Sequence, residues 1–454
     1  GGRRFQCNFC GGMSECPTFY FAHIRADGRR ADSEERPELS RGSVELVATK
    51  DYMVRPPMVV THFFLIDASA YAVESGATAC ACAAIASVLD SIQGGDSTRI
   101  GIATFDAHLN FFSMKPGKQA TMLVMPDSSD PYCPAPSALV VNLRENRDSI
   151  AELLEAIPGM FTQPQPAESI GGAALFGALQ VLKGCGGKIT MFLASVPNTG
   201  MMAVKARPQG VKSGDRDPQK ILQCGDPSWT RLGQQCADYQ VAVDLFLLSR
   251  HYMDIATLSE VVHRTGGSLY EYDGFTPELD QGQLENDLRW NMVRPQGMEA
   301  VMRVRCSAGL SVEEYGGAIY QRTLTDVDLA AIDSDKAILV KFKHEEKLSD
   351  TQNAFFQAAL LYTNTSGQRR IRVHTIAVPC TNVLGTLYRA AELDTQIFWM
   401  ARKAAEALPG ATLAGVREQV TGQCVDILYA YRRYCATSTS SGQLILPEAL
   451  KLLP

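Results

Sequence analysis

Cysteines near the start of the sequence could bind a metal ion. Cys7 and Cys10 form a Cys-x-x-Cys pair, a spacing that lets two thiolates reach one tetrahedral Zn²⁺. A structural zinc site needs two further ligands, and only Cys16 and His23 follow nearby. The pair therefore predicts one half of a zinc site, with unpaired loop cysteines as the alternative interpretation.

Oxygen ligands at Asp67 and Ser69 are a second candidate site. They follow an apolar run at 60–66, which is typical of a strand buried on both faces of a parallel sheet. Ligands bind at the carboxyl ends of such strands, and von Willebrand A-type domains hold Mg²⁺ there with Asp-x-Ser-x-Ser and oxygens from two further loops. Tyr71 stands in place of the third oxygen, and Ala194 follows the strand after which another Asp is expected. We therefore expect no Mg²⁺ at Asp67, where a capped strand-to-helix turn is the favoured interpretation.

Arg303 and Arg305 could bind a carboxylate. They are two residues apart on a predicted strand, so their guanidinium groups project from the same face. Two arginines in this position can clamp a carboxylate with paired hydrogen bonds. A solvated sheet face is the alternative interpretation.

Enzyme motifs are incomplete. Residues 344–348 resemble a zinc protease helix, but Leu348 stands where the second histidine is needed. Residues 184–188 resemble a phosphate-binding loop without its first glycine or its Ser/Thr, and the sequence has no Gly-x-Ser-x-Gly. We therefore predict that the chain is not an enzyme. An enzyme of unknown type would need a cluster of titratable groups with shifted pKa values in one pocket.

The bulk properties fit a soluble, multidomain protein. The chain has 454 residues, more than one hydrophobic core usually supports, and its net charge of −6 gives no overall attraction to nucleic acid. No apolar run approaches the roughly 20 residues that span a bilayer, and the first residues lack a signal-peptide pattern. The 13 cysteines lie mostly in apolar runs, as reduced thiols do in the cytosol. We expect a cytoplasmic protein without disulfides.

Strands and helices alternate through the middle of the chain, which predicts βαβ units and a mostly parallel sheet. Strands are expected at 59–67, 99–105, 188–194 and 240–248, and helices at 72–92, 147–157, 171–182, 254–264 and 281–291. The stretch 205–229, rich in Lys, Asp, Gly and Pro, is expected to be a surface insertion.

The pattern changes after Gly297. Runs at 298–306, 337–344, 353–363 and 370–378 are β-rich without intervening helices, so we expect a separate antiparallel sandwich to which residues 44–48 contribute a strand. Residues 384–408 and 413–434 have helical spacing of apolar residues. The fold class is therefore multidomain, α/β followed by all-β and then α.

These segments together resemble the cargo-adaptor subunit of the COPII inner coat, the Sec twenty-four family. The resemblance is carried, in the family's order, by residues 3–10, 45–57, 99–106, 243–249, 299–306 and 368–375. It implies a partial zinc finger at 3–40, a β-sandwich segment at 41–57, a von Willebrand A-like trunk at 58–296, the β-sandwich at 297–379 and a truncated helical domain at 380–454. The family's other Cys-x-x-Cys pair and its gelsolin-like domain would then lie outside this sequence.

The resemblance also implies a function. A member would select cargo by binding export signals on cytosolic tails of cargo and SNARE proteins, pair through its trunk with the coat's GTPase-activating subunit, and lie on endoplasmic reticulum membrane beside a small GTPase. It implies that Cys7 and Cys10 bind structural zinc and that Arg303 and Arg305, with Arg36 as a further candidate from its Arg-Pro-Glu context, bind acidic signals. No nucleic acid is expected as a partner. A metal-dependent von Willebrand A-type binding module is the alternative.

Overall fold

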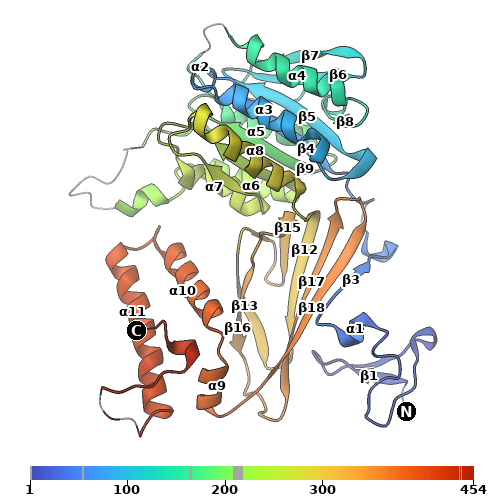
Figure 1. Ribbon diagram of the computed structural model, residues 1–454, viewed down its shortest axis with the longest axis vertical. Helices are drawn as coiled ribbons and strands as arrows, with labels where there is room; N and C mark the ends of the chain where they lie inside the picture. Colours follow the sequence, from blue (N-terminus) through green and yellow to red (C-terminus); the bar gives the residue numbers. More distant parts are fainter. Residues whose placement is uncertain are drawn as a thin grey trace.

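The computed structural model describes residues 3–53, 56–162, 166–207, 218–438, 440 and 442–453. An α/β unit forms one end of the molecule and a β-sandwich lies below it (Figure 1). Three C-terminal helices and a small N-terminal unit flank the sandwich on opposite sides. The expected combination of an α/β unit with a mostly parallel sheet, an all-β layer and a helical part is confirmed.

One eight-stranded sheet organises the α/β unit. Its order is β11-β10-β9-β4-β5-β6-β7, with β8 also paired to β5. Five strands are parallel, whereas β6, β7 and β8 are antiparallel to their neighbours. The strands are β4 (Thr61–Asp67), β5 (Arg99–Phe105), β6 (Leu109–Lys115), β7 (Lys118–Met125), β8 (Val141–Asn142), β9 (Gly187–Leu193), β10 (Val241–Leu247) and β11 (Leu269–Glu271). The sequence patterns predict the four long parallel strands but miss the β6–β7 hairpin.

Helices cover both faces of this sheet because β4 is apolar on both of them. Phe64 and Ile66 belong to a core shared with α3, α4 and α8, and Phe63 and Leu65 belong to a core shared with α5, α6 and α7. The helices are α3 (Ala77–Val88), α4 (Arg147–Met160), α5 (Gly171–Leu182), α6 (Pro227–Asp238), α7 (Ile255–Thr265) and α8 (Pro277–Val293). Burial of each such side chain contributes about 1.5–3 kcal/mol, and every residue of β4 is buried.

The single helix expected at 72–92 is wrong. The segment forms α2 (Ala70–Glu74), α3 and a short 3₁₀ turn, and Gly76 separates the two helices. Gly76 has a φ of 79°, and a Cβ there would lie 2.9 Å from Cγ of Pro277. The helix breaks at Gly76 because this residue has a left-handed backbone conformation. Its missing side chain also leaves room for Pro277, the first residue of α8.

The surface insertion expected at 205–229 is only partly described, because residues 208–217 lie outside the described residues. At its carboxyl end the expectation is wrong. Pro227 begins α6, Trp229 is fully buried, and its Nε1 donates a hydrogen bond to the carbonyl of Met202 at 3.1 Å. The last residues of the stretch therefore belong to a helix whose Trp229 is buried in the core.

The sandwich packs a two-stranded sheet, β13-β16, on a six-stranded sheet ordered β14-β15-β12-β17-β18-β3. Its strands are β3 (Ser43–Val47), β12 (Gln296–Cys306), β13 (Leu310–Gly316), β14 (Tyr320–Gln321), β15 (Asp326–Asp333), β16 (Leu339–His344), β17 (Asn353–Asn364) and β18 (Arg369–Pro379). The expected strand before the α/β unit is confirmed, since β3 pairs antiparallel with β18. The sequence patterns miss β13 and β15.

Three helices follow the sandwich: α9 (Leu384–Ala390), α10 (Leu393–Ala407) and α11 (Leu413–Tyr434). The expected helix at 384–408 is divided because the Glu392 carboxylate accepts hydrogen bonds from the amides of Asp394 and Thr395 and starts α10 anew. Lys403 on α10 is ion-paired with Glu314 on β13, which joins the helices to the sandwich. Within the described residues no helix has the length and apolarity to cross a bilayer.

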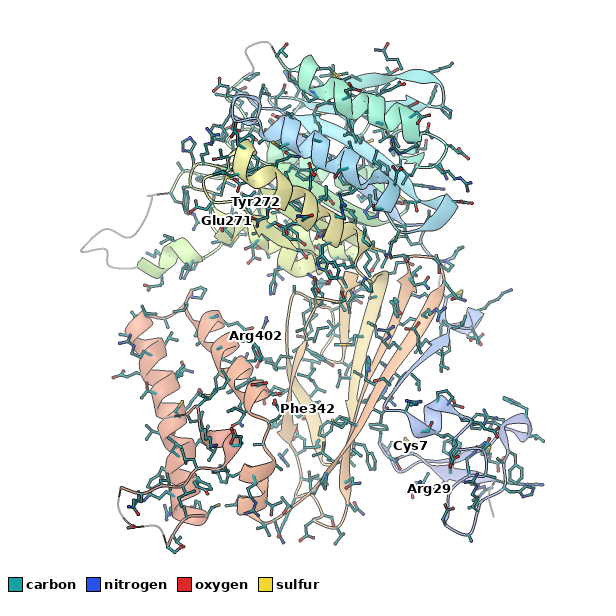
Figure 2. The ribbon with its side chains drawn as sticks, in the orientation of Figure 1. Cys7, Arg29, Glu271, Tyr272, Phe342 and Arg402 are labelled. Carbon is teal, nitrogen blue, oxygen red and sulfur yellow. The ribbon has the colours of Figure 1, made fainter. Side chains whose placement is uncertain are left out.

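The N-terminal unit is small and largely exposed. It contains β1 (Arg4–Gln6), β2 (Met13–Glu15) and α1 (Pro37–Ser40). Phe9 of this unit lies edge-on to Phe355 of β17, with 6.4 Å between the ring centroids. Phe356, the next residue, instead meets Phe342 of β16 inside the sandwich. Adjacent strand residues face opposite sides, so the N-terminal unit lies on the outer face of the six-stranded sheet. Figure 2 labels Cys7 and Phe342 on opposite sides of that sheet.

Candidate functional site

The outer face of β12 carries two arginines. Met302 and Val304 are buried in the sandwich core, whereas Arg303 and Arg305 are exposed. This alternation follows from the strand period of two and places both guanidinium groups on one side, as their spacing predicts. It is the same side on which the N-terminal unit packs, because Arg305 pairs in register with Gln357, two residues from Phe355.

Arg303 already has a carboxylate partner. It lies opposite Asp326 of β15 in the antiparallel register, and its Nε and Nη2 donate to Oδ1 and Oδ2 of that residue. The hydrogen bonds to Asp326 raise the pKa of Arg303, and those from Arg303 lower the pKa of Asp326. Arg303 therefore has an internal acid as its partner, supplied by the neighbouring strand, and its binding of an external carboxylate stays a prediction.

Arg305 differs from Arg303 in its contacts. It makes no hydrogen bond or ion pair within the part of the chain that the structure describes. Its register neighbour Gln357 is engaged elsewhere, since Gln357 Nε2 donates to Thr375 Oγ1 at 3.2 Å. An exposed guanidinium with all its donors unused can bind an incoming carboxylate without breaking an internal contact.

Arg36 lies in a different setting. Its guanidinium and that of Arg30 both stack on the ring of Tyr20, at 4.2 and 4.4 Å from the ring centroid, and both are ion-paired with Asp32. The Tyr20 hydroxyl donates to Glu38 at 2.7 Å. The hydrogen bonds from Arg30 and Arg36 strongly lower the pKa of Asp32. Arg36 therefore stabilises the N-terminal unit and already has Asp32 and Glu38 as ion-pair partners.

Cys7 and Cys10 lie on one tight turn. The amide of Gly11 donates to the Cys7 carbonyl at 2.9 Å, and the amide of Cys7 donates to the Gly12 carbonyl at 2.8 Å. Hydrogen bonds from the backbone amides of Cys10 and Phe9 lower the pKa of the Cys7 thiol. A lowered pKa favours the thiolate, which is the form of cysteine that binds a metal ion.

Within the described residues, Cys16 and His23 do not join this pair as ligands. Cys16 Sγ contacts the Pro17 carbonyl and an Arg30 nitrogen, and the His23 ring packs on Phe21. Among the residues that the structure describes, no three Cys, His, Asp or Glu side chains gather as a metal site. The turn fits two of the four ligands of a structural zinc site.

Backbone and hydroxyl donors surround the carboxylate of Asp67. Oδ1 accepts from the Ser69 amide at 2.9 Å, and Oδ2 accepts from the amides of Ala194 and Ser195 at 3.0 and 3.3 Å and from the Ser195 hydroxyl at 3.4 Å. Burial raises the pKa of Asp67. The Tyr71 hydroxyl accepts from the Arg250 amide at 2.9 Å. Asp67 thus ties the end of β4 to the loop after β9.

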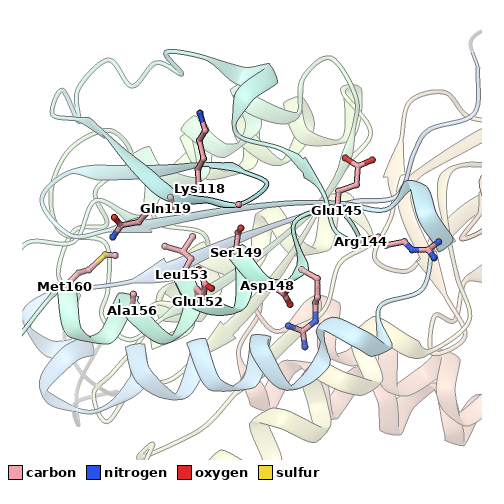
Figure 3. Close-up of a pocket in the computed structure, with 13 residues that line it drawn as sticks. Lys118, Gln119, Arg144, Glu145, Asp148, Ser149, Glu152, Leu153, Ala156 and Met160 are labelled. Atoms are coloured by element: carbon pink, nitrogen blue, oxygen red, sulfur yellow. The ribbon is translucent and has the colours of Figure 1, made fainter.

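A pocket of about 640 Å³ lies between β7 and α4 (Figure 3). Its walls carry both signs of charge. Arg144 is ion-paired with Asp96 and Arg147 with Asp90, the latter at 2.7 Å, while Asp148 and Glu152 of α4 add negative charge. Such a pocket is poorly suited to an acidic ligand, so the exposed face of β12 is the stronger candidate for one.

Sequence reasoning misses two side chains of this site. Asp326 begins β15, and the alternating run 326–333 could have identified that strand, although not its register with β12. Phe9 has no sequence signal for its contact with Phe355, because the two residues are distant in the chain.

Comparisons with known proteins agree along the whole chain. Family models for the Sec23/Sec24 trunk, beta-sandwich and helical domains match residues 57–292, 297–381 and 392–454. The chain is 48% identical to the protein transport protein SEC24 B of Arabidopsis thaliana and 38% identical to Sec24C of Homo sapiens, covering 100% of this chain and 42% of each relative. It therefore spans less than half the length of these relatives.

Solved structures give the same result. The crystal structure of the human COPII-coat protein Sec24c superposes with a TM-score of 0.92 at 38% identity, covering 100% of this chain and 61% of that one. A von Willebrand factor type A protein from Catenulispora acidiphila, with a TM-score of 0.50 and 11% identity over 86% of this chain and 77% of that one, shows likeness of fold alone. The chain belongs to the Sec23/Sec24 family, and its similarity within that family is to Sec24 proteins.

Proposed function

We propose that the chain is a cargo-selecting adaptor of the COPII vesicle coat. It binds acidic export signals on the cytosolic tails of cargo and SNARE proteins during transport from the endoplasmic reticulum to the Golgi, and it catalyses no reaction. The observation that carries this proposal is Arg305, an unpartnered guanidinium on the outer face of β12 in a chain of the Sec23/Sec24 family.

One exposed guanidinium with a few neighbouring contacts gives weak binding. Single sites of this kind reach about micromolar affinity, and several weak sites on one assembled coat add through their high effective concentration. Weak binding also allows the tail to dissociate when the coat disassembles. The design therefore favours many exchangeable contacts over one tight contact.

The partners follow from the family. The chain pairs through its α/β trunk with the GTPase-activating subunit of the coat, lies beside the coat's small GTPase, and is peripheral on endoplasmic reticulum membrane while otherwise cytoplasmic. The Sec23/Sec24 trunk model over residues 57–292 supports a trunk-mediated pairing. The net charge of −6 argues against nucleic acid as a partner.

Zinc is the proposed cofactor. Cys7 and Cys10 supply two of the four ligands of such a site. A bound zinc would fix the N-terminal unit structurally. The colorimetric release of one Zn²⁺ per chain on thiol modification, from a protein extended upstream, tests this; no released zinc would contradict it.

Asp67 is proposed to be structural and to bind no Mg²⁺. Its two oxygens already accept four hydrogen bonds, which supports this reading over a metal-dependent von Willebrand A-type module. A Mg²⁺ titration of the protein by calorimetry should give only the heat of dilution. Saturable heat that Asp67→Asn removes would favour the metal-dependent module.

A peptide titration tests cargo binding. The double variant Arg303→Ala, Arg305→Ala should abolish binding of an acidic peptide and leave recovery of the GTPase-activating subunit in a pull-down unchanged. A matched control is Lys341→Ala, Lys343→Ala, which also removes two cations spaced by two residues, from β16 of the other sheet. Equal peptide affinity of the arginine variant and the parent chain would exclude this site.

A further inference from the structure

We propose that Asp326 competes with the acidic signal for Arg303. An incoming tail would then bind Arg305 with its first carboxylate and reach Arg303 only by displacing Asp326. The proposal rests on the proposed function, because it concerns the same arginine face. It assigns to β15 a residue that sets cargo affinity and selects between tails with one and tails with two acidic side chains.

The geometry of the Arg303–Asp326 pair is that of a ligand already in place. Two parallel N–H···O bonds join the guanidinium to both carboxylate oxygens, which is the arrangement that a cargo carboxylate would adopt. The Asp326 backbone is fixed independently, since its amide donates to Thr323 Oγ1 at 3.0 Å. Asp326 can therefore release Arg303 by a side-chain rotation without moving its strand.

The pair is exposed enough to exchange. The side chain of Arg303 is 45% exposed and that of Asp326 is 25% exposed. Water can solvate both groups when they separate, so this exposed pair opens at a lower cost than a buried pair would. An incoming carboxylate would replace one hydrogen-bonded acid by another on the same guanidinium.

Charge counting gives the consequence. Arg303, Arg305 and Asp326 together carry one net positive charge. Asp328, the next residue along β15 on the same side, has its own partner in Arg322 at 2.9 Å. A tail with one carboxylate is therefore matched by Arg305 alone. A tail with two acidic side chains gains its second contact only by displacing Asp326.

Variants at Asp326 separate this mechanism from a simple two-arginine clamp. Asp326→Asn should lower the Kd for a peptide with two acidic residues spaced by one residue about fivefold, because Arg303 becomes available. Arg303→Ala should raise the Kd about tenfold, because it exposes the Asp326 charge beside Arg305. The double variant Arg303→Ala, Asp326→Asn restores the net charge of the parent face.

The double variant Arg303→Ala, Asp326→Asn distinguishes the two mechanisms. For a peptide with a single acidic residue, we expect it to bind within about twofold of the parent chain, because Arg305 is intact and no acid repels the ligand. If Arg303 were the direct ligand and Asp326 only structural, the double variant would bind as weakly as Arg303→Ala. That result would overturn the proposal.

The measurement is a fluorescence anisotropy titration of the labelled peptides, with an amide-substituted peptide of the same sequence as the uncharged probe. Glu313→Gln on β13 is the matched control, since it removes one exposed carboxylate from the other sheet and should leave every Kd unchanged. Thermal unfolding of each variant identifies any loss of fold. The proposed function fails if the parent chain binds no acidic peptide, or if Arg305→Ala binds the peptide as the parent does. If both controls behave as expected and Asp326→Asn has the same Kd as the parent, only the proposed role of Asp326 fails.

Discussion

Strands β12 and β15 are joined by two Arg–Asp pairs, one near each end, and the pairs differ mainly in burial. Arg294, just before β12, pairs with Asp333 at 2.8 Å, and both side chains are at most 4% exposed. Arg303 pairs with Asp326 at the other end, where the side chains are 45% and 25% exposed. The same chemistry thus forms a structural joint where water is excluded and an exchangeable contact where water has access.

The buried pair lies at the junction of the trunk with the sandwich. Arg294 Nη2 donates to Ser268 Oγ at 3.0 Å, and Lys336 Nζ donates to the Gly267 carbonyl at 2.6 Å. Ser268 and Gly267 belong to the trunk, next to β11, whereas Asp333 ends β15 of the sandwich. The network therefore fixes the orientation of the β12 face that carries Arg303 and Arg305 relative to the trunk.

The largest expected effect is on the buried pair. Arg294→Met should lower the free energy of unfolding by about 3–5 kcal/mol, because it leaves the Asp333 carboxylate buried with only the more distant Lys336. Guanidinium denaturation measures the change, with Arg303→Met as the matched control. A loss below about 1 kcal/mol for Arg294→Met would remove the distinction between the two pairs.

A smaller effect is expected from acid at His62, a buried residue of β4. Burial, and next the charge of Lys188, lower the pKa of His62 to about 3. The folded state keeps this imidazole neutral below pH 6.5, where the unfolded chain takes up a proton, so His62 adds a loss of stability as pH falls from about 6.5 toward 3. The slope is about 1.4 kcal/mol per pH unit between those values.

His62→Gln should flatten the stability profile between pH 6.5 and 5, and urea denaturation at several pH values measures this slope. An unchanged profile in the variant would assign the pH dependence to other groups. The exposed pair should contribute nothing to that window, because Arg303 lowers the pKa of Asp326 below its ordinary value. A carboxylate with a lowered pKa contributes stability above its unfolded pKa and loses it only in stronger acid.

The smallest effect is expected at the exposed pair itself. Arg303→Met should lower the free energy of unfolding by less than about 1 kcal/mol at low salt, and the difference should disappear near 1 M NaCl because ions screen an exposed pair. Arg294→Met should keep its full effect at that salt concentration. Equal salt sensitivity of both variants would show that burial does not separate the pairs.

Local patterns predict much of this arrangement. The apolar run of β4 and the two-residue spacing of Arg303 and Arg305 depend on neighbours in the chain, and both are found as expected. The partner of Arg303 depends on the register of a strand that begins 23 residues later, which no local pattern fixes. Gly76 and Trp229 likewise contradict local expectations because residues distant in the sequence, Pro277 and Met202, decide their surroundings.

The contact of Phe9 with Phe355 has a practical consequence for peptide titrations at Arg305. One pocket is lined by Cys7 and Phe9 of the N-terminal unit and by Phe355 of β17. Ser307, which follows β12 and lies two residues beyond Arg305, also lines it. If the proposed zinc binds at Cys7 and Cys10, a sample without zinc would have an altered turn next to an intact Arg305 guanidinium. Its titration would imitate an arginine substitution, so metal content should be assayed on every sample before a weak Kd is assigned to any side chain.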